Sequence, residues 1–351
     1  AEAARDAVRM LEESAQALSE ARGGRERVKA LTEIVKGYET GLAALRDGMR
    51  AASLKEAQLT EDLQARDKEI SRLLGVLQSI SRAPAPVTLL HPSGPTGTAR
   101  AGMLLSDVTP GLKARADALR ADLEEVQALR LLQAQSAAKL QEGLEGAQEA
   151  RTALSKAVAD RTDLPRRFVE NPVQTAVLIA ATETLEGFAS GLSPTAEDEA
   201  PGSLPDISHR KGKLALPVQG QLLRRAGEAD AAGVRRPGLL IATGPQAVVT
   251  TPTAATIRYA GPLLNYGLVA ILEPQADTLF IFAGLEAVFG QTGQVLPAGD
   301  PLGLMGGELR TDVSLSGDGA GNARPETLYI EVRELNQPVD PQDWFRTTDK
   351  G

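Results

Sequence analysis

The sequence predicts an α+β protein of several domains, in which an antiparallel coiled-coil hairpin precedes a mostly antiparallel β domain. The first observation is a 3-4 spacing of apolar residues from Val28 to Ile80, held for about seven heptads and flanked by charged residues. The second is a series of short apolar segments, separated by turn residues, that begins after Lys213. A chain of 351 residues has room for two or three such domains.

The hairpin is predicted from two long apolar seams on either side of a proline-rich region. The first seam is interrupted only by Glu56 and Arg66, and it contains no proline. Five prolines then fall within residues 84–110. Because proline lacks a backbone donor and clashes with the preceding turn, the first helix is predicted to end there. Helical periodicity resumes at Leu112, so residues 1–165 are predicted to form a hairpin that turns at about 84–110.

The proline-rich turn carries two apolar islands, and the turn has too little chain to bury them all. They consist of Leu89 and Leu90 in the first island, and Met103, Leu104 and Leu105 in the second. Either the islands fold onto each other to close the turn, or they form an exposed tip that binds a partner. Both interpretations stay open on the sequence alone.

Residues 166–192 form a separate segment, in which one amphipathic helix is predicted over 168–192. Pro172 suits its first turn. Its apolar face consists of Val173, Val177, Ile179, Leu185 and Phe188. A single short helix is marginal in water, so this one must lie on another part of the protein. Residues 193–212 have the composition of a mobile linker and lead into a β domain over 213–346.

Seven short strands with no helical pattern among them predict the antiparallel sheet of this domain. They are expected at 214–218, 238–242, 247–250, 255–259, 267–273, 278–282 and 327–333.

Composition excludes several classes of function. The net charge of −8 argues against a nucleic-acid binder, which needs a basic face. No apolar run approaches 18 residues, so no membrane span is predicted. Cysteine is absent, which removes disulfides, thiolate chemistry and cysteine-based zinc sites. The two histidines, His91 and His209, are interpreted as solvated loop residues, and no metal or other cofactor is predicted. The chain opens without a methionine, which fits either a mature form after signal-peptide removal or a trimmed chain.

Several motifs follow one another in a fixed order along the β segment. They are LPVQG at 216–220, RPGLL at 236–240, NYGLVAILE at 265–273, GQTGQVLPAGDPLG at 290–303, TLYIEVR at 327–333, PVDP at 338–341, and Trp344. In this order they resemble the LytM (lysostaphin-type) zinc endopeptidases. With its hairpin, apolar helix and linker, the whole chain resembles the EnvC-type murein hydrolase activators.

The resemblance implies a domain that has lost its zinc chemistry. Active peptidases of this type bind zinc through a His-x-x-x-Asp segment and a His-x-His strand, and a further histidine assists the attacking water. The first motif falls on Arg236 and Leu240, the second on Thr327 and Tyr329, and the further histidine on Gly284. These side chains offer no adequate zinc ligand, so the chain is expected not to be an enzyme.

The resemblance further implies a periplasmic activator of N-acetylmuramoyl-L-alanine amidases in cell division, whose hairpin binds the periplasmic domain of FtsX in the FtsEX complex. The amidase is expected to bind the former substrate groove, at Arg236, Pro237, Leu240, Tyr266, Phe280, Tyr329 and Arg333. Pro237 departs from the basic residue common in relatives. The helix over 168–192 is expected to cover this groove until FtsEX releases it. A zinc endopeptidase and a periplasmic transport adaptor are the alternatives.

Overall fold

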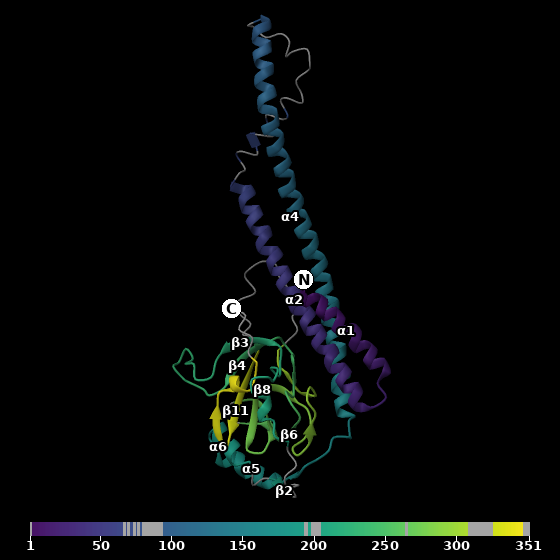
Figure 1. Ribbon diagram of the computed structural model, residues 1–351, viewed down its shortest axis with the longest axis vertical. Coiled ribbons are helices and arrows are strands. Elements are labelled where there is room, and N and C mark those ends of the chain that lie inside the picture. Colours follow the sequence, from purple (N-terminus) through teal and green to yellow (C-terminus); the bar gives the residue numbers. More distant parts are fainter. Residues whose placement is uncertain are drawn as a thin grey trace. The chain divides into compact units, whose positions relative to one another are not determined.

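The computed structural model of the chain describes residues 2–65, 94–192, 196–197, 205–263, 266–307 and 326–346, with Lys68, Ser71, Arg72, Gly75 and Gln78 (Figure 1). For residues 94–102, 104, 105, 108, 196 and 197 it describes the backbone alone. The chain divides into two compact units, residues 1–44 with 141–351, and residues 45–140. Long N-terminal helices are followed by an antiparallel β domain, which confirms the predicted fold class.

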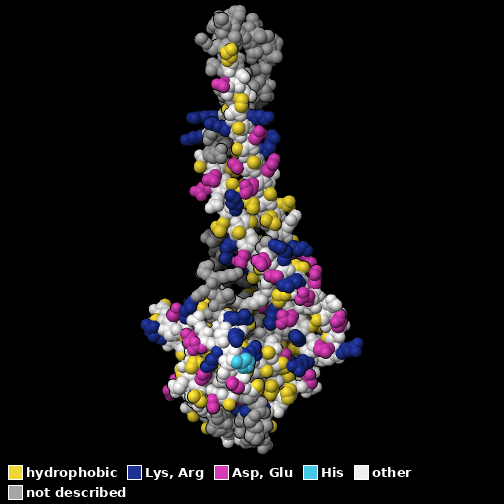
Figure 2. Space-filling view, in the orientation of Figure 1, with side chains coloured by type: hydrophobic (Ala, Val, Ile, Leu, Met, Phe, Trp, Pro, Cys, Tyr) yellow, Lys and Arg dark blue, Asp and Glu magenta, His cyan; other side chains and the backbone are white. Residues whose placement is uncertain are grey.

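The N-terminal part consists of α1 (Glu2–Glu20), α2 (Gly24–Ala65) and α4 (Gly94–Ala159). The predicted seam of α2 is buried in both units: Val28 and Val35 pack against Leu154 of α4 in the first, and Met49 and Ala52 are buried in the second. On the face shown in Figure 2, side chains of both charge signs are interspersed along the hairpin helices. This pattern is typical of helices that are held together by an apolar seam and solvated elsewhere.

The polar interruption at Glu56 is paired across the hairpin. Arg130 Nε donates to Glu56 at 2.7 Å and Gln133 Nε2 donates to it at 3.1 Å, and these hydrogen bonds lower the pKa of the carboxyl. The helical periodicity that resumes at Leu112 places Leu123 in the apolar seam of α4, but its side chain is 47% exposed. The buried face passes through Gln133 instead, because a polar partner for Glu56 occupies a position that apolar periodicity cannot identify.

The predicted turn at 84–110 is too long, because α4 already begins at Gly94 and contains Pro110. Pro95 is the second residue of this helix, where an N–H has no helical partner to lose. Pro110 removes one hydrogen bond from a helix of 66 residues, which tolerates the loss. The reversal of the chain, with Leu89 and Leu90, lies outside the described residues.

The β domain is one antiparallel sheet of ten strands, in the spatial order β3-β4-β11-β8-β7-β6-β9. In addition, β10 pairs with β5 and β8, and β12 pairs with β11. The strands are β3 (Gly220–Arg224), β4 (Leu239–Thr243), β5 (Val248–Thr250), β6 (Ala255–Pro262), β7 (Leu268–Gln275), β8 (Thr278–Val288), β9 (Val295–Leu296), β10 (Pro301–Met305), β11 (Glu326–Glu334) and β12 (Gln337–Val339).

Six of the seven predicted strands are present, and the one predicted at 214–218 is not. There Leu214 forms only an isolated bridge to Phe345, with its side chain buried in the core. The apolar residues of 214–218 pack into the core, but the segment does not pair with a neighbouring strand as part of the sheet. Strands β3, β9, β10 and β12 were not predicted, since they are short or contain glycine or proline.

Alternation of side chains gives the sheet two buried faces. The first face includes Phe280, Phe282 and Ile330 and packs against Trp344 and Phe345. The second face consists of Tyr259, Leu263, Val269, Ile271, Ile281, Ala283 and Tyr329. Neighbouring residues of β8 and β11 therefore belong to different cores.

The segment predicted as one helix over 168–192 contains two. These are α5 (Pro172–Ala181) and α6 (Leu185–Ser190), preceded by β1 (Val169–Glu170), which pairs with β2 (Ala196–Glu197). Asn171 caps α5, and the hydroxyl of Thr184 accepts from Gly187 N–H at 3.1 Å to cap α6. The prediction of a single helix is wrong because a threonine at an N-cap position favours the start of a new helix over continuation of the previous one.

The predicted linker over 193–212 is also too long. Ile207 is buried, and its N–H donates to Gln275 Oε1 at 2.7 Å. Arg210 donates to Thr253 Oγ1 at 2.7 Å, beside the 3-10 turn Ser208–Arg210. One buried isoleucine is enough to fix this end of the segment to the β domain. Among the residues that the structure describes, no helix combines the length and apolarity needed to cross a membrane.

Candidate partner-binding face

The predicted zinc positions come together on strands β4, β11 and β8. Tyr329 of β11 lies opposite Leu240 of β4 on one side and Ala283 of β8 on the other. Gly284 N–H donates to Tyr266 O at 3.0 Å, and the rings of Tyr266 and Tyr329 lie 6.4 Å apart. The register therefore brings Leu240, Tyr266, Tyr329 and Gly284 close together.

The residues at this place do not fit a zinc ion. Leu240 offers no donor atom, and Gly284 has a φ of +94° and touches Thr327 O, which leaves no room for a side chain. The Tyr329 hydroxyl donates to Glu331 Oε2 at 2.7 Å, and burial together with that carboxylate raises its pKa far above the usual range. The Tyr329 side chain is therefore neutral, and its hydroxyl is already hydrogen-bonded to Glu331. Arg236 is exposed and cationic, 3.8 Å from Asp230.

Of the two histidines, the structure describes only His209, which is not at this place. His209 is exposed in the turn before β3, and His91 lies outside the described residues. Within the described parts of the chain, no group of three or more His, Cys, Asp or Glu side chains is arranged to hold a metal ion.

The second face of the sheet is covered by residues 171–192, here called the cover. From α6 and the two residues after it, Leu185, Phe188 and Leu192 are buried against this face, beside β11 (Figure 1). The rings of Phe188 and Tyr259 meet edge to face, with centroids 4.7 Å apart. Burial of three large apolar side chains contributes about 1.5–3 kcal/mol each, before the cost of ordering the segment.

A row of polar side chains on β11 lies under the cover. Arg333 is buried, donates to Glu331 Oε1 at 2.8 Å and to Asn336 O at 2.5 Å, and contacts Glu186 of α6 at 3.4 Å. Glu331 also accepts from Tyr329. These hydrogen bonds offset part of the cost of burying the ion pair, although Arg333 Nε is buried without a hydrogen-bond partner among the described residues. Arg333 thus belongs to the floor beneath the cover and is not accessible while the cover is closed.

Two groups of predicted site residues lie elsewhere. Phe280 is fully buried on the first face, 5.4 Å from the Trp344 ring, because its position in β8 has the opposite parity to Ile281. Val173 and Val177 are 70% and 62% exposed, so they point away from the sheet. Ile179, which was also predicted on the buried face, is partly buried there, together with Leu178. The prediction for α5 is therefore wrong only for Val173 and Val177, since this helix is apolar on both sides.

The remaining predicted residues are only partly described. Pro237 is exposed beside Arg236, at the entrance to β4. Met103 is 73% exposed on α4. The side chains of Leu104 and Leu105 lie outside what the structure describes. Sequence reasoning missed Tyr259, Val269 and Ile271 as part of the second face, although the continuous apolar run of β7 is typical of a strand that is buried on both faces.

Fold and face together define a LytM-like β domain whose zinc positions carry other residues, joined to a helical hairpin. No model of a known protein family matches the chain. It is 27% identical over 135 residues to the murein hydrolase activator EnvC of Escherichia coli K12, which covers 38% of this chain and 29% of EnvC. This match confirms the resemblance to EnvC-type activators that the motifs predicted.

Other similarities extend over comparable lengths. The chain is 31% identical over 160 residues to an uncharacterized protein of Neisseria meningitidis serogroup B, covering 43% of this chain and 24% of that protein. The chain thus matches about a quarter to a third of the length of these curated relatives.

Two solved structures are similar at lower identity. One is a putative M23 peptidase of Pseudomonas aeruginosa, with 20% identity, 41% of this chain and 53% of that chain covered, and a TM-score of 0.31. The other is the catalytic domain of lysostaphin from Staphylococcus simulans, with 15% identity, 35% and 89% covered, and a TM-score of 0.28.

Proposed function

We propose that this chain is a non-catalytic activator of peptidoglycan amidases, which acts in the periplasm during cell division. The observation that carries the proposal is the match to EnvC together with the residues at the zinc positions. A leucine, a glycine and an engaged tyrosine cannot activate water, whereas the aromatic rings of Tyr266 and Tyr329 suit recognition of a protein. The same residues disfavour a zinc endopeptidase.

The partner surface in this proposal is the second face of the sheet with its rim. Leu240, Tyr266, Tyr329 and Arg236 retain the role expected from the motifs, while Phe280 leaves the set. An amidase can reach most of this surface only when α6 is displaced, because Leu185 and Phe188 occupy it. The cover is therefore autoinhibitory. An open fraction below about 1% needs a closing free energy of only about 3 kcal/mol.

The signal for opening is proposed to come from the hairpin through the periplasmic domain of FtsX in the FtsEX complex. The contact is placed at Leu89, Leu90, Met103, Leu104 and Leu105. The exposure of Met103 supports an apolar contact there. Leu104→Glu should abolish binding of the FtsX periplasmic domain, measured by calorimetry, and unchanged affinity would move the contact elsewhere on the hairpin.

An amidase assay with purified components tests the inhibited state. Leu185→Glu places a charge in the buried contact of α6 and should activate the amidase without FtsEX. Val173→Glu is the matched control, because it adds the same charge to the exposed side of the same segment and should leave activation unchanged. Equal activation by the two variants and the parent chain would contradict an inhibitory cover.

Metal analysis separates this proposal from the endopeptidase. The purified chain is expected to hold no stoichiometric zinc and to cleave no peptide of peptidoglycan. One tight zinc per chain, with cleavage lost on chelation, would favour the peptidase instead.

A further inference from the structure

The chain that leads from α4 to the cover lies extended on the β domain. Val295 N–H donates to Pro165 O at 2.9 Å, and Arg167 N–H donates to Gly293 O at 2.8 Å. Arg166 and Gln294 form an antiparallel bridge between these two hydrogen bonds. Residues 161–168, here called the anchor, thus add a short strand next to β9.

The side chains of the anchor are fixed as firmly as its backbone. Phe168 is buried with the Arg258 guanidinium 4.8 Å above its ring, and Arg167 reaches Glu273 at 3.0 Å. Gly293 permits the close approach, since a Cβ there would collide with Phe168 O. At the other end, Arg161 is buried and bonds Asp300 at 2.6 Å. Two buried ion pairs and two backbone hydrogen bonds therefore hold these eight residues.

The cover is held less firmly than the anchor. One side of α5 is exposed. The helix α6 is only six residues long, and only one of its faces is buried. Its polar link, Glu186 to Arg333, is 3.4 Å long, and the Glu186 side chain is 67% exposed. Surface pairs of this kind contribute about 0–1 kcal/mol. Segments with few buried contacts open first, so the cover is expected to open before the anchor.

The two ends of the cover are tied together by the β1–β2 ladder. Val169 lies opposite Glu197, and Glu170 lies opposite Ala196. The cover begins directly after β1 and ends shortly before β2. It is therefore a closed loop attached through the anchor, and its natural pivot is at 169–171.

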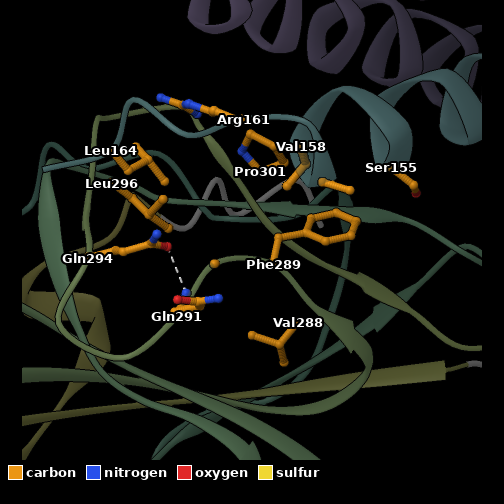
Figure 3. A pocket seen from close by; sticks show the side chains of 12 residues that line it. Ser155, Val158, Arg161, Leu164, Val288, Phe289, Gln291, Gln294, Leu296 and Pro301 are labelled. Atoms are coloured by element: carbon orange, nitrogen blue, oxygen red, sulfur yellow. Dashed lines mark hydrogen bonds between the residues drawn. The ribbon is translucent and has the colours of Figure 1, made fainter. Parts of the chain in front are cut away.

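A cavity separates the end of α4 from the surface that carries the anchor. It has a volume of about 330 Å³ and is lined by Ser155 and Val158 of α4, and by Leu164, Phe289 and Gln294 (Figure 3). The last turn of α4 is thus not fully packed against the loop after β8.

We propose that the cover opens by swinging about residues 169–171 while the anchor stays attached to β9. The inference rests on the proposed function only in taking exposure of the second face as the consequence of opening. A pull on the chain at the end of α4 is then borne by the anchor, not by α6. Signals from the hairpin must reach the cover through the β domain.

Native-state hydrogen exchange of the full chain tests this without any amidase. Amides of residues 185–192 should exchange at least about tenfold faster, relative to their intrinsic rates, than the amides of Arg167 and Val295. The two groups should also differ in how steeply low urea accelerates exchange. Equal protection and equal urea dependence would show that anchor and cover open as one unit, which overturns the proposal.

A disulfide tests the same point in the opened state. The bonds of Pro165 and Arg167 make Arg166 and Gln294 a non-hydrogen-bonded pair, whose Cα atoms lie about 4.5 Å apart and suit a disulfide. The chain has no cysteine of its own, so Arg166→Cys with Gln294→Cys gives one defined bond. Combined with Leu185→Glu, the oxidised variant should keep rapid exchange over 185–192, within twofold of the reduced form.

If oxidation instead restores slow exchange over 185–192 and reduction removes it, the anchor must detach for opening and the proposal is wrong. The amidase assay on the same variant is a separate readout. Rapid exchange without amidase activation would overturn the proposed function and leave the pivot intact.

Discussion

The two faces of the sheet are buried by different kinds of contact. The first face is closed by Trp344 and Phe345, which follow β12 after the 3-10 turn Pro341–Asp343 and are buried. The second face is covered by α6, which comes from before the first strand of the sheet and lies over the buried pair of Glu331 and Arg333. A face closed by its own strands and tail is a permanent core. A face closed by a separate segment above polar groups can serve as a surface once that segment leaves.

The largest expected effect follows from opening the first face. Trp344→Ala removes a buried ring that packs on Phe280 at 5.4 Å and whose Nε1 donates to Glu334 at 2.8 Å. The variant should lose about 3–5 kcal/mol of the free energy of unfolding. This loss is measured by urea unfolding of the full chain, monitored by a circular dichroism signal that does not depend on tryptophan. A loss below about 1 kcal/mol would show that this face is not the core of the domain.

A smaller effect is expected for the equivalent change on the second face. Phe188→Ala also removes a fully buried ring, but the segment that carries it can open by itself. The loss of free energy of unfolding is then limited to the closing free energy of the cover, which is about 3 kcal/mol for an open fraction of about 1%. Exchange over 185–192 should accelerate strongly, whereas Phe282 and Ile330 stay protected. Equal acceleration of both faces would make them one cooperative core.

Sequence reasoning predicted the architecture well because it depends on periodicity. The seam of α2 and six strands follow from spacing alone, whereas the proximity of Leu240 and Tyr329 was implied by the resemblance to the zinc endopeptidases. Sequence reasoning failed where the burial of a residue depends on a contact with a distant part of the chain. Gln133 is buried only because Glu56 lies opposite, and α5 is apolar on both sides, so no periodicity shows which side faces the sheet.

Phe280 illustrates a further limit of prediction from sequence. In β8 every residue from Leu279 to Ala283 is apolar, and therefore alternation cannot tell which parity faces which core. Only the register with β11, in which Val332 lies opposite Phe280, places that ring on the first face.

The hairpin base contacts the β domain at a third surface, where a buried carboxylate allows a test by pH. Glu39 accepts from Val248 N–H at 2.9 Å and from Arg151 at 3.2 Å, and burial raises its pKa above the ordinary 4.5. Because the folded state holds this proton more tightly, its contribution to stability is full below pH 4.5 and is lost as pH rises through the raised pKa.

Glu39→Gln removes that titration. The free energy of unfolding of the parent, minus that of the variant, should therefore fall as the pH increases above 4.5. Parallel pH profiles would show that Glu39 does not titrate differently in the folded chain. Exchange over 185–192 should keep the same pH profile in both proteins, since neither face of the sheet contains this group.

The smallest effect is expected from the polar contact between Glu186 of α6 and Arg333 of the sheet. Glu186→Ala removes the 3.4 Å contact with Arg333, but the Glu186 side chain is largely exposed, and Arg333 keeps its hydrogen bonds to Glu331 and to Asn336 O. The closing free energy of the cover should fall by less than about 1 kcal/mol, which is at most about a fivefold rise in the open fraction. Exchange over 185–192 measures the change, and Glu183→Ala, on the exposed residue before the Thr184 cap, is the matched control. A rise much larger than fivefold for Glu186→Ala would mean that charge, not apolar burial, keeps the second face closed, and the two faces would then differ in the nature of their cohesion as well as in its strength.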